Sequence, residues 1–92
     1  MIYRWEARFK KAYKTLPKEI QEKADKAFLL FVQNPRHPSL RVKKMQGYEG
    51  IWECRVDRSY RITFEYDKDD ESGESICRFR NIGTHDILEK AP

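Results

Sequence analysis

Apolar residues recur along the first third of the chain with the period of helices. After a short candidate strand at residues 2–5, Phe9, Tyr13 and Leu16 follow the i, i+4, i+7 spacing of one helix face. Pro17 interrupts this helix and suits the first turn of a second one, because its missing N–H is not needed there. The second helix has an apolar stripe made of Ile20, Ala24, Ala27, Phe28 and Phe31. This part of the sequence therefore predicts a strand followed by two helices.

The segment Asn-Pro-Arg-His-Pro at 34–38 ends the second helix, because each proline disfavours helix in the residue before it. Beyond it the period falls to two, which is typical of strands with one buried face. Strands are expected at 40–45, 51–56, 60–66 and 76–82, with turns at 47–50 and 57–59. The fold class is therefore predicted to be α+β, with a two-helix hairpin packed on one face of a mainly antiparallel four- to five-stranded sheet. Residues 1–92 are expected to form a single domain.

The cysteine and histidine content argues against cross-links and metal sites. Two cysteines, Cys54 and Cys77, are too few for a disulfide framework, and no metal-ligand spacing joins them to the two histidines. We therefore expect no metal and no other cofactor. Since no apolar run approaches ~18 residues and the first residues lack a secretory apolar stretch, we expect a cytoplasmic protein without a membrane partner.

Charge is unevenly distributed along the chain, whose net charge is +4. Between Arg36 and Arg61 there are seven Arg or Lys residues against three acids, whereas residues 67–74 hold five acids and only Lys68. This pattern indicates a polyanion-binding surface beside an acidic hairpin tip. Charge alone also suits a small protein whose lysines and arginines only keep it in solution.

The alternation within the strands gathers the arginines on one face. Trp52, Cys54 and Val56 are predicted to face the helices. The opposite face would carry Glu53, Arg55, Arg61, Thr63, Arg78 and Arg80. Neighbouring like charges destabilise a sheet, so such an array favours an anionic ligand, for which the arginine fork is well matched. The alternative is that Glu53 and Glu65 form cross-strand pairs with these arginines.

Three motifs then resemble one family. They are Gly50-Ile51-Trp52-Glu53-Cys54-Arg55-Val56, Ser59-Tyr60-Arg61-Ile62-Thr63-Phe64 and Arg80-Asn81-Ile82-Gly83-Thr84-His85. Their order on a strand, two helices and antiparallel strands resembles the RelE/ParE superfamily of toxin–antitoxin systems. This superfamily includes ribosome-dependent messenger-RNA endonucleases of the RelE, YoeB and YafQ type and gyrase inhibitors of the ParE type.

The resemblance implies roles for five residues. Arg61 matches an arginine that contacts the scissile phosphate in the RelE and YoeB branches, and His85 matches a catalytic arginine or histidine. Arg55 falls where RelE has a lysine and YafQ a histidine, both implicated in cleavage. Glu53 stands where RelE has a further lysine, so this chain has a negative charge where RelE has a positive one. His37 resembles a YafQ-type histidine in the loop before the sheet.

The chemistry implied is cleavage without metal, in which the 2′-hydroxyl of RNA attacks the adjacent phosphorus. We expect His85 to act as acid, Arg61 and Arg55 to hold the phosphate, and Glu53 to be the candidate base. Further contacts to RNA phosphates are expected from Arg78, Arg80, Lys43, Lys44 and His37. A histidine at the end of a strand also commonly serves only to bond backbone, and that reading of His85 stays open.

The sequence departs from the family pattern after the last strand, where the aromatic residue that closes the site in these toxins has no counterpart. Ile87, Leu88, Glu89 and Lys90 follow His85 instead. The expected function is that of a toxin cleaving messenger RNA on the ribosome, with a cognate antitoxin as partner. The alternatives are a gyrase-inhibiting binding protein of the ParE type and a homologue that has lost its toxicity.

Overall fold

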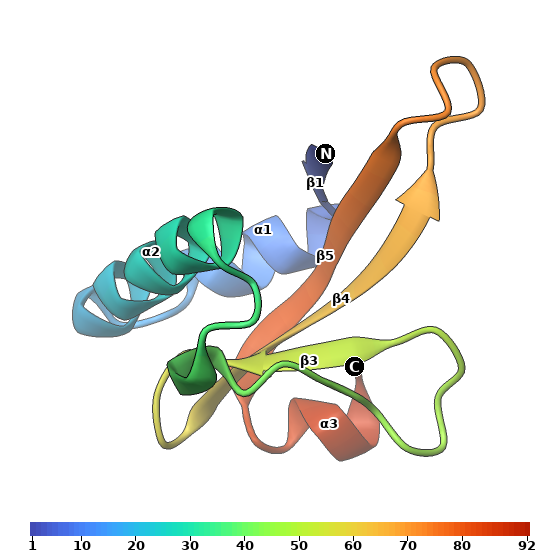
Figure 1. The fold of residues 1–92 in the computed structure, drawn as a ribbon. Coiled ribbons are helices and arrows are strands. Elements are labelled where there is room, and N and C mark those ends of the chain that lie inside the picture. Colours follow the sequence, from blue (N-terminus) through green and yellow to red (C-terminus); the bar gives the residue numbers. More distant parts are fainter.

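The computed structural model describes residues 1–92 as two helices against one face of a sheet, with a short helix at the C-terminal end (Figure 1). The elements are β1 (Ile2–Trp5), α1 (Ala7–Lys14), α2 (Lys18–Gln33), the 3-10 helix Pro38–Leu40, β2 (Lys43–Lys44), β3 (Trp52–Arg55), β4 (Tyr60–Lys68), β5 (Ser75–Thr84) and α3 (Ile87–Lys90). The five strands lie in the order β1-β5-β4-β3-β2. Only β1 and β5 run parallel, so the predicted α+β class with a mainly antiparallel sheet is confirmed.

The core lies between the helices and the sheet. The predicted stripe of α2 is confirmed, since Ile20, Ala24, Ala27 and Phe31 are all buried. Phe79 of β5 is at the centre of this core, because six aromatic rings have centroids 4.9 to 6.3 Å from its own. These rings belong to Tyr3, Trp5, Phe9, Phe28, Phe31 and Phe64. None of the helices is both long and apolar enough to cross a membrane.

The predicted strand at 40–45 is wrong over most of its length. Residues 38–40 form a 3-10 helix instead, and Leu40 is buried in the core. The next residue, Arg41, has left-handed backbone angles (φ 47°, ψ 48°), and only Lys43–Lys44 pairs as a strand. The reason is local: the side chain of His37 accepts a hydrogen bond from the backbone N–H of Ser39, which begins a helical turn where a strand would need extended backbone.

The C-terminal segment is an element that the sequence did not predict. Helix α3 lies away from α1 and α2 in Figure 1 and contacts β4 and β5. A Cβ on Gly83 would lie 2.7 Å from Cγ2 of Ile87, so glycine at this position permits the close approach of α3. Asn81 donates a hydrogen bond to the carbonyl of Ala91 (2.6 Å), and the side chains of Arg8 and Arg80 donate to the carbonyl of Pro92. The sheet face opposite the two long helices is therefore partly covered.

Candidate functional site

The strand register places two rows of side chains on the sheet face that points away from α1 and α2. In the first row, Lys43 pairs with Glu53, Glu53 with Thr63, and Thr63 with Asn81. In the second row, Arg55 pairs with Arg61 and Arg61 with Gly83. Directly paired residues share a face of the sheet, with Cβ atoms roughly 4.5–5.5 Å apart. The strands therefore bring together charged residues that lie far apart in the sequence.

A cleft of about 230 Å³ lies over these rows. It is lined by Arg41, Lys43, Glu53, Arg55, Arg61, His85 and Leu88. Glu53 is its only carboxylate; this side chain is largely buried and forms no ion pair or hydrogen bond with another side chain. The cleft therefore offers cationic groups, one histidine and one free carboxylate to a ligand.

The two paired arginines are held by the turn between β3 and β4. Arg55 Nε donates to the carbonyl oxygen of Asp57 (3.1 Å), and Arg61 Nη1 donates to the same oxygen (2.7 Å). The Asp57 carboxylate accepts hydrogen bonds from the backbone N–H groups of Ser59 and Tyr60, both at 2.8 Å, which fixes the turn. Two guanidinium groups are thus anchored side by side through backbone, without a carboxylate between them.

The electrostatic effect of this crowding is visible at Arg55. Loss of solvent contact lowers the pKa of its guanidinium, and the positive charges of Arg41, Arg61 and Arg58 lower the pKa further. An arginine stays charged even so. An anion bound among these side chains would relieve the repulsion, so the arrangement favours phosphate binding.

His85 lies immediately beyond the end of β5. Its backbone N–H donates to the carbonyl of Ser59 (3.0 Å), and its carbonyl accepts from Leu88 N–H (3.1 Å), so the residue is fixed between the β3–β4 turn and α3. The imidazole lines the cleft and forms no hydrogen bond within the protein. Its ring nitrogens are therefore free to form hydrogen bonds with a ligand in the cleft. Leu88 of α3 lies in the cleft wall, in the segment where the family pattern has an aromatic residue.

Arg78 and Arg80 lie outside this cleft. The pairing shifts by one residue between Thr63 and Phe64, which leaves Arg80 unpaired in a β-bulge. Arg78 Nη1 lies 3.3 Å from Glu65 Oε1, and Arg80 Nη1 lies 3.4 Å from the same oxygen. For these two arginines the structure has the cross-strand ion pairs of the alternative interpretation. The four arginines predicted on this face thus form two groups. Arg78 and Arg80 are paired with carboxylates, whereas Arg55 and Arg61 are not.

Lys44 and His37 are also separate from the cleft. Lys44 Nζ lies 5.4 Å from the centroid of the Trp52 ring, a cation–π arrangement. His37 Nδ1 is 2.8 Å from the hydroxyl of Ser39, and its side chain lines another pocket with Trp52 and Tyr66. Of the predicted site residues, Glu53, Arg55, Arg61, His85 and Lys43 meet in the cleft. Arg41 and Leu88 were not predicted as site residues: Arg41 lies in the segment wrongly predicted as a strand, and Leu88 lies in the unpredicted helix α3. Only the excess of basic residues after Arg36 pointed toward Arg41.

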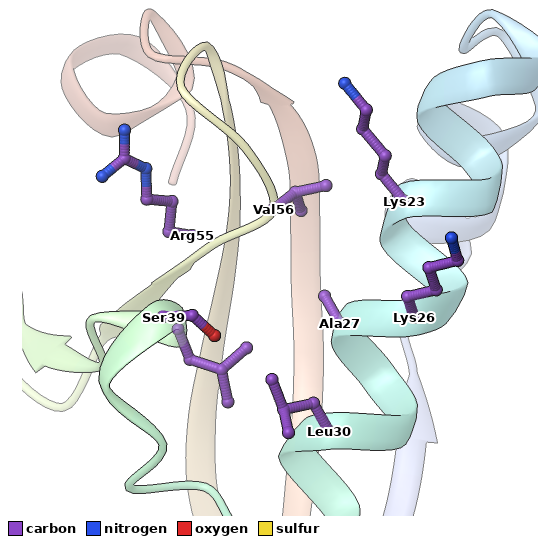
Figure 2. Close-up of a pocket in the computed structure, with 8 residues that line it drawn as sticks. Lys23, Lys26, Ala27, Leu30, Ser39, Arg55 and Val56 are labelled. Atoms are coloured by element: carbon purple, nitrogen blue, oxygen red, sulfur yellow. The ribbon is translucent and has the colours of Figure 1, made fainter.

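A second hollow lies on the helix side of Arg55, between α2 and the end of β3 (Figure 2). Ala27 and Leu30 of α2 face Val56 across it, and Lys23 and Lys26 lie along its rim. Arg55 lines both this groove and the cleft. We call it the α2 groove.

Fold and site together define a small α+β protein with a cationic cleft on a partly covered sheet face. No group of three or more Cys, His, Asp or Glu side chains is placed to hold a metal ion. Residues 3–81 match the family described as "ParE toxin of type II toxin-antitoxin system, parDE". The chain therefore belongs to this family of toxins.

Solved structures share the whole fold at low sequence identity. The YoeB/ParE toxin from Agrobacterium tumefaciens is 15% identical, with a TM-score of 0.71, over 92% of this chain and 99% of that one. YafQ from E. coli strain BL21(DE3) is 20% identical, with a TM-score of 0.70, over 95% and 96%. RelE in the RelB–RelE antitoxin–toxin complex from Methanococcus jannaschii is 22% identical, with a TM-score of 0.62, over 97% and 99%. No curated protein sequence matches the chain.

Proposed function

We propose that this toxin is an endoribonuclease that cleaves messenger RNA on the ribosome. The observation that carries the proposal is the cleft, in which two arginines without carboxylate partners, one unbonded histidine and one free carboxylate converge. These are the groups that RNA cleavage without metal requires. A protein that only binds gyrase has no need of an acid and a base beside a phosphate site.

In the proposed reaction the 2′-oxygen of one nucleotide forms a bond to the adjacent phosphorus while the bond from phosphorus to the 5′-oxygen breaks. Glu53 accepts the 2′-hydroxyl proton. Arg61 and Arg55 stabilise the dianionic phosphorane by donating hydrogen bonds to its equatorial oxygens, which is typically the largest catalytic contribution. His85 donates a proton to the leaving 5′-oxygen. The products are a 2′,3′-cyclic phosphate and a free 5′-hydroxyl.

A protein partner is part of the proposal. Similar structures include the E. coli DinJ–YafQ complex and the Methanococcus jannaschii RelB–RelE complex, and each is a toxin bound to its antitoxin. We infer that this chain binds an antitoxin as well. An acidic partner segment suits a chain of net charge +4 with unpaired arginines on its surface.

The test is primer extension on messenger RNA in a translating extract, with and without ribosomes. His85→Ala and Arg61→Ala should each lower the cleavage rate by about 10²- to 10⁴-fold. The first variant removes the proposed acid, and the second removes an arginine proposed to bind the phosphate. Both side chains are at least partly exposed, so the free energy of unfolding should fall by about 1 kcal/mol or less. Arg4→Ala, an exposed arginine on the edge strand β1, is the matched control and should cleave as the wild type does.

Two outcomes would overturn the proposal. A folded wild-type protein that leaves RNA intact but blocks gyrase supercoiling is a binding protein of the ParE type. A folded protein inactive in both assays has lost the activity of its relatives, in line with the missing aromatic residue after His85.

A further inference from the structure

The basic surface continues beyond the cleft. A further pocket, distinct from the cleft and from the α2 groove, adjoins Arg55. It is lined by Pro38, Ser39, Arg41, Arg55, Val56, Asp57 and Arg58. Arg41 and Arg55 line this pocket and the cleft alike. We call this pocket the Arg41–Arg58 notch. The cleft and the notch therefore adjoin, with Arg41 and Arg55 at their common border.

The arginines of the notch have no internal counter-ion. Arg41 and Arg58 are exposed, and neither forms a salt bridge. The only carboxylate there, Asp57, is already occupied: one oxygen accepts from the N–H groups of Ser59 and Tyr60, and the other lies 3.4 Å from Lys23 Nζ. The notch thus holds positive charge that the fold leaves unneutralised.

The backbone of Arg41 is a second, independent observation. Its φ of 47° is the only positive φ at a residue other than glycine in the chain. A side chain with a Cβ disfavours this region, and glycine is its ordinary occupant. Arg41 has no hydrogen bond or ion pair from its side chain that would compensate within the protein. Arg41 ends the 3-10 helix Pro38–Leu40, a position where left-handed backbone is common but glycine or asparagine is the usual residue. An arginine here thus keeps an exposed positive charge at the expense of a less favourable backbone.

We propose that Arg41 and Arg58 form a second phosphate subsite, which binds the RNA backbone phosphate adjacent to the scissile one. Arg55 lies between the two subsites and contributes to both. The inference rests on the proposed function, since it specifies how the same site holds its RNA. It also explains why a small protein keeps four arginines close together, because two neighbouring phosphates supply the missing negative charge.

The test compares two probes that differ in the number of phosphates. A single-stranded oligoribonucleotide spans both subsites, whereas a dinucleotide carries one bridging phosphate and fits the cleft alone. In Arg41→Gly/Arg58→Ala, affinity for the oligoribonucleotide should fall about tenfold, and the slope of log affinity against log salt should become shallower by about 0.7, the value for one phosphate contact on single strands. Affinity for the dinucleotide should fall much less, because the double variant keeps Arg55 and Arg61 in the cleft and loses only Arg41 from its wall.

A stability measurement separates binding from folding. Arg41→Gly alone should melt at or above the wild-type temperature, because glycine accepts the left-handed backbone without strain. A lower melting temperature would make Arg41 a structural residue and overturn the proposal. Equal losses for both probes, or an unchanged salt slope, would overturn it as well.

The two proposals fail in different ways. If wild type cleaves messenger RNA but the double variant keeps the wild-type salt slope, the subsite is wrong and the nuclease stands. If the double variant loses the expected slope but wild type cuts no RNA, the subsite stands and the nuclease is wrong. A double variant that binds RNA normally but loses affinity for an acidic antitoxin would assign the notch to the protein partner and overturn the subsite.

Discussion

Arginines on the same sheet face differ in the groups to which their guanidinium nitrogens are bonded. Arg78 lies within 3.3 Å of carboxylate oxygens of both Glu65 and Asp67, whereas Arg55 and Arg61 donate to a backbone carbonyl. Hydrogen bonds that Arg78 donates to Asp67 and Glu65 raise its pKa despite partial loss of solvent, while the pKa of Arg55 is lowered. The unpaired arginines are therefore the ones available to a ligand, and residue type alone does not distinguish them.

The two cysteines give a test of the core by pH. Cys54 and Cys77 are buried and free, which confirms the predicted strand faces, and burial raises the pKa of each thiol to about 12. The folded protein therefore keeps these protons while the unfolded chain loses them above its ordinary pKa of 9.0. Their contribution to stability is complete below pH 9 and should be lost as the pH rises toward 12.

Urea unfolding at a series of alkaline pH values measures this loss. Cys54→Ala should make the decline shallower than in wild type, because one of the two titrating thiols is gone. Rapid alkylation of both thiols in the native protein at neutral pH would contradict the burial on which the prediction rests.

At the scale of elements, the β3–β4 hairpin positions Arg55 and Arg61, the two arginines proposed to bind the phosphate. Asp57→Ala removes the acceptor for the Ser59 and Tyr60 N–H groups, so the carbonyl shared by Arg55 and Arg61 should move. We expect cleavage to fall about 10- to 100-fold, with a loss of about 1–2 kcal/mol in the free energy of unfolding. Asp57→Asn keeps an oxygen acceptor and should restore most of the activity.

The matched control lies in the β4–β5 turn. Asp69 accepts hydrogen bonds from the N–H and the hydroxyl of Ser72, a similar cap with no arginine attached to it. Asp69→Ala should lose similar stability and retain full cleavage, as measured by urea unfolding and primer extension. Equal loss of activity in Asp57→Ala and Asp69→Ala would show that turn stability alone matters.

Helices and strands with a strong repeating pattern of apolar residues could be predicted from the sequence. Elements that depend on tertiary contacts could not. The α2 stripe and the alternation at Cys54 and Ile62 follow from periods of 3.6 and 2, which act locally. Helix α3 has only four residues and depends on the space left by Gly83, which no local pattern reveals. The family resemblance assigned Arg61 and His85 to one site, and both line the cleft. The bulge at Arg80 that divides the arginines depends on pairing between strands, which the sequence pattern does not show.

At the scale of the whole molecule, the positive surface extends from the cleft around Arg55 to the α2 groove. We expect an acidic antitoxin to copurify with this chain and to suppress RNA cleavage. Lys26→Glu reverses an exposed charge at the rim of the groove, away from the Asp57 turn, and should weaken this complex, while cleavage by the free toxin stays unchanged. Size-exclusion chromatography after coexpression, followed by primer extension, measures both effects; separate elution of the two wild-type proteins would refute the complex.

The parallel pairing of β1 with β5 joins two strands that are separated in the sequence by α1, α2 and the other three strands. Ile2 pairs with Ile76 and Trp5 with Phe79, so β1 has no strand to join until residues 76–79 have left the ribosome. During synthesis β1 therefore stays unpaired until β5 has been made. His85 emerges later still. A nascent chain, or a fragment released before that point, has neither a complete sheet nor a complete cleft, so the sheet and the cleft are completed together, late in the synthesis of this domain.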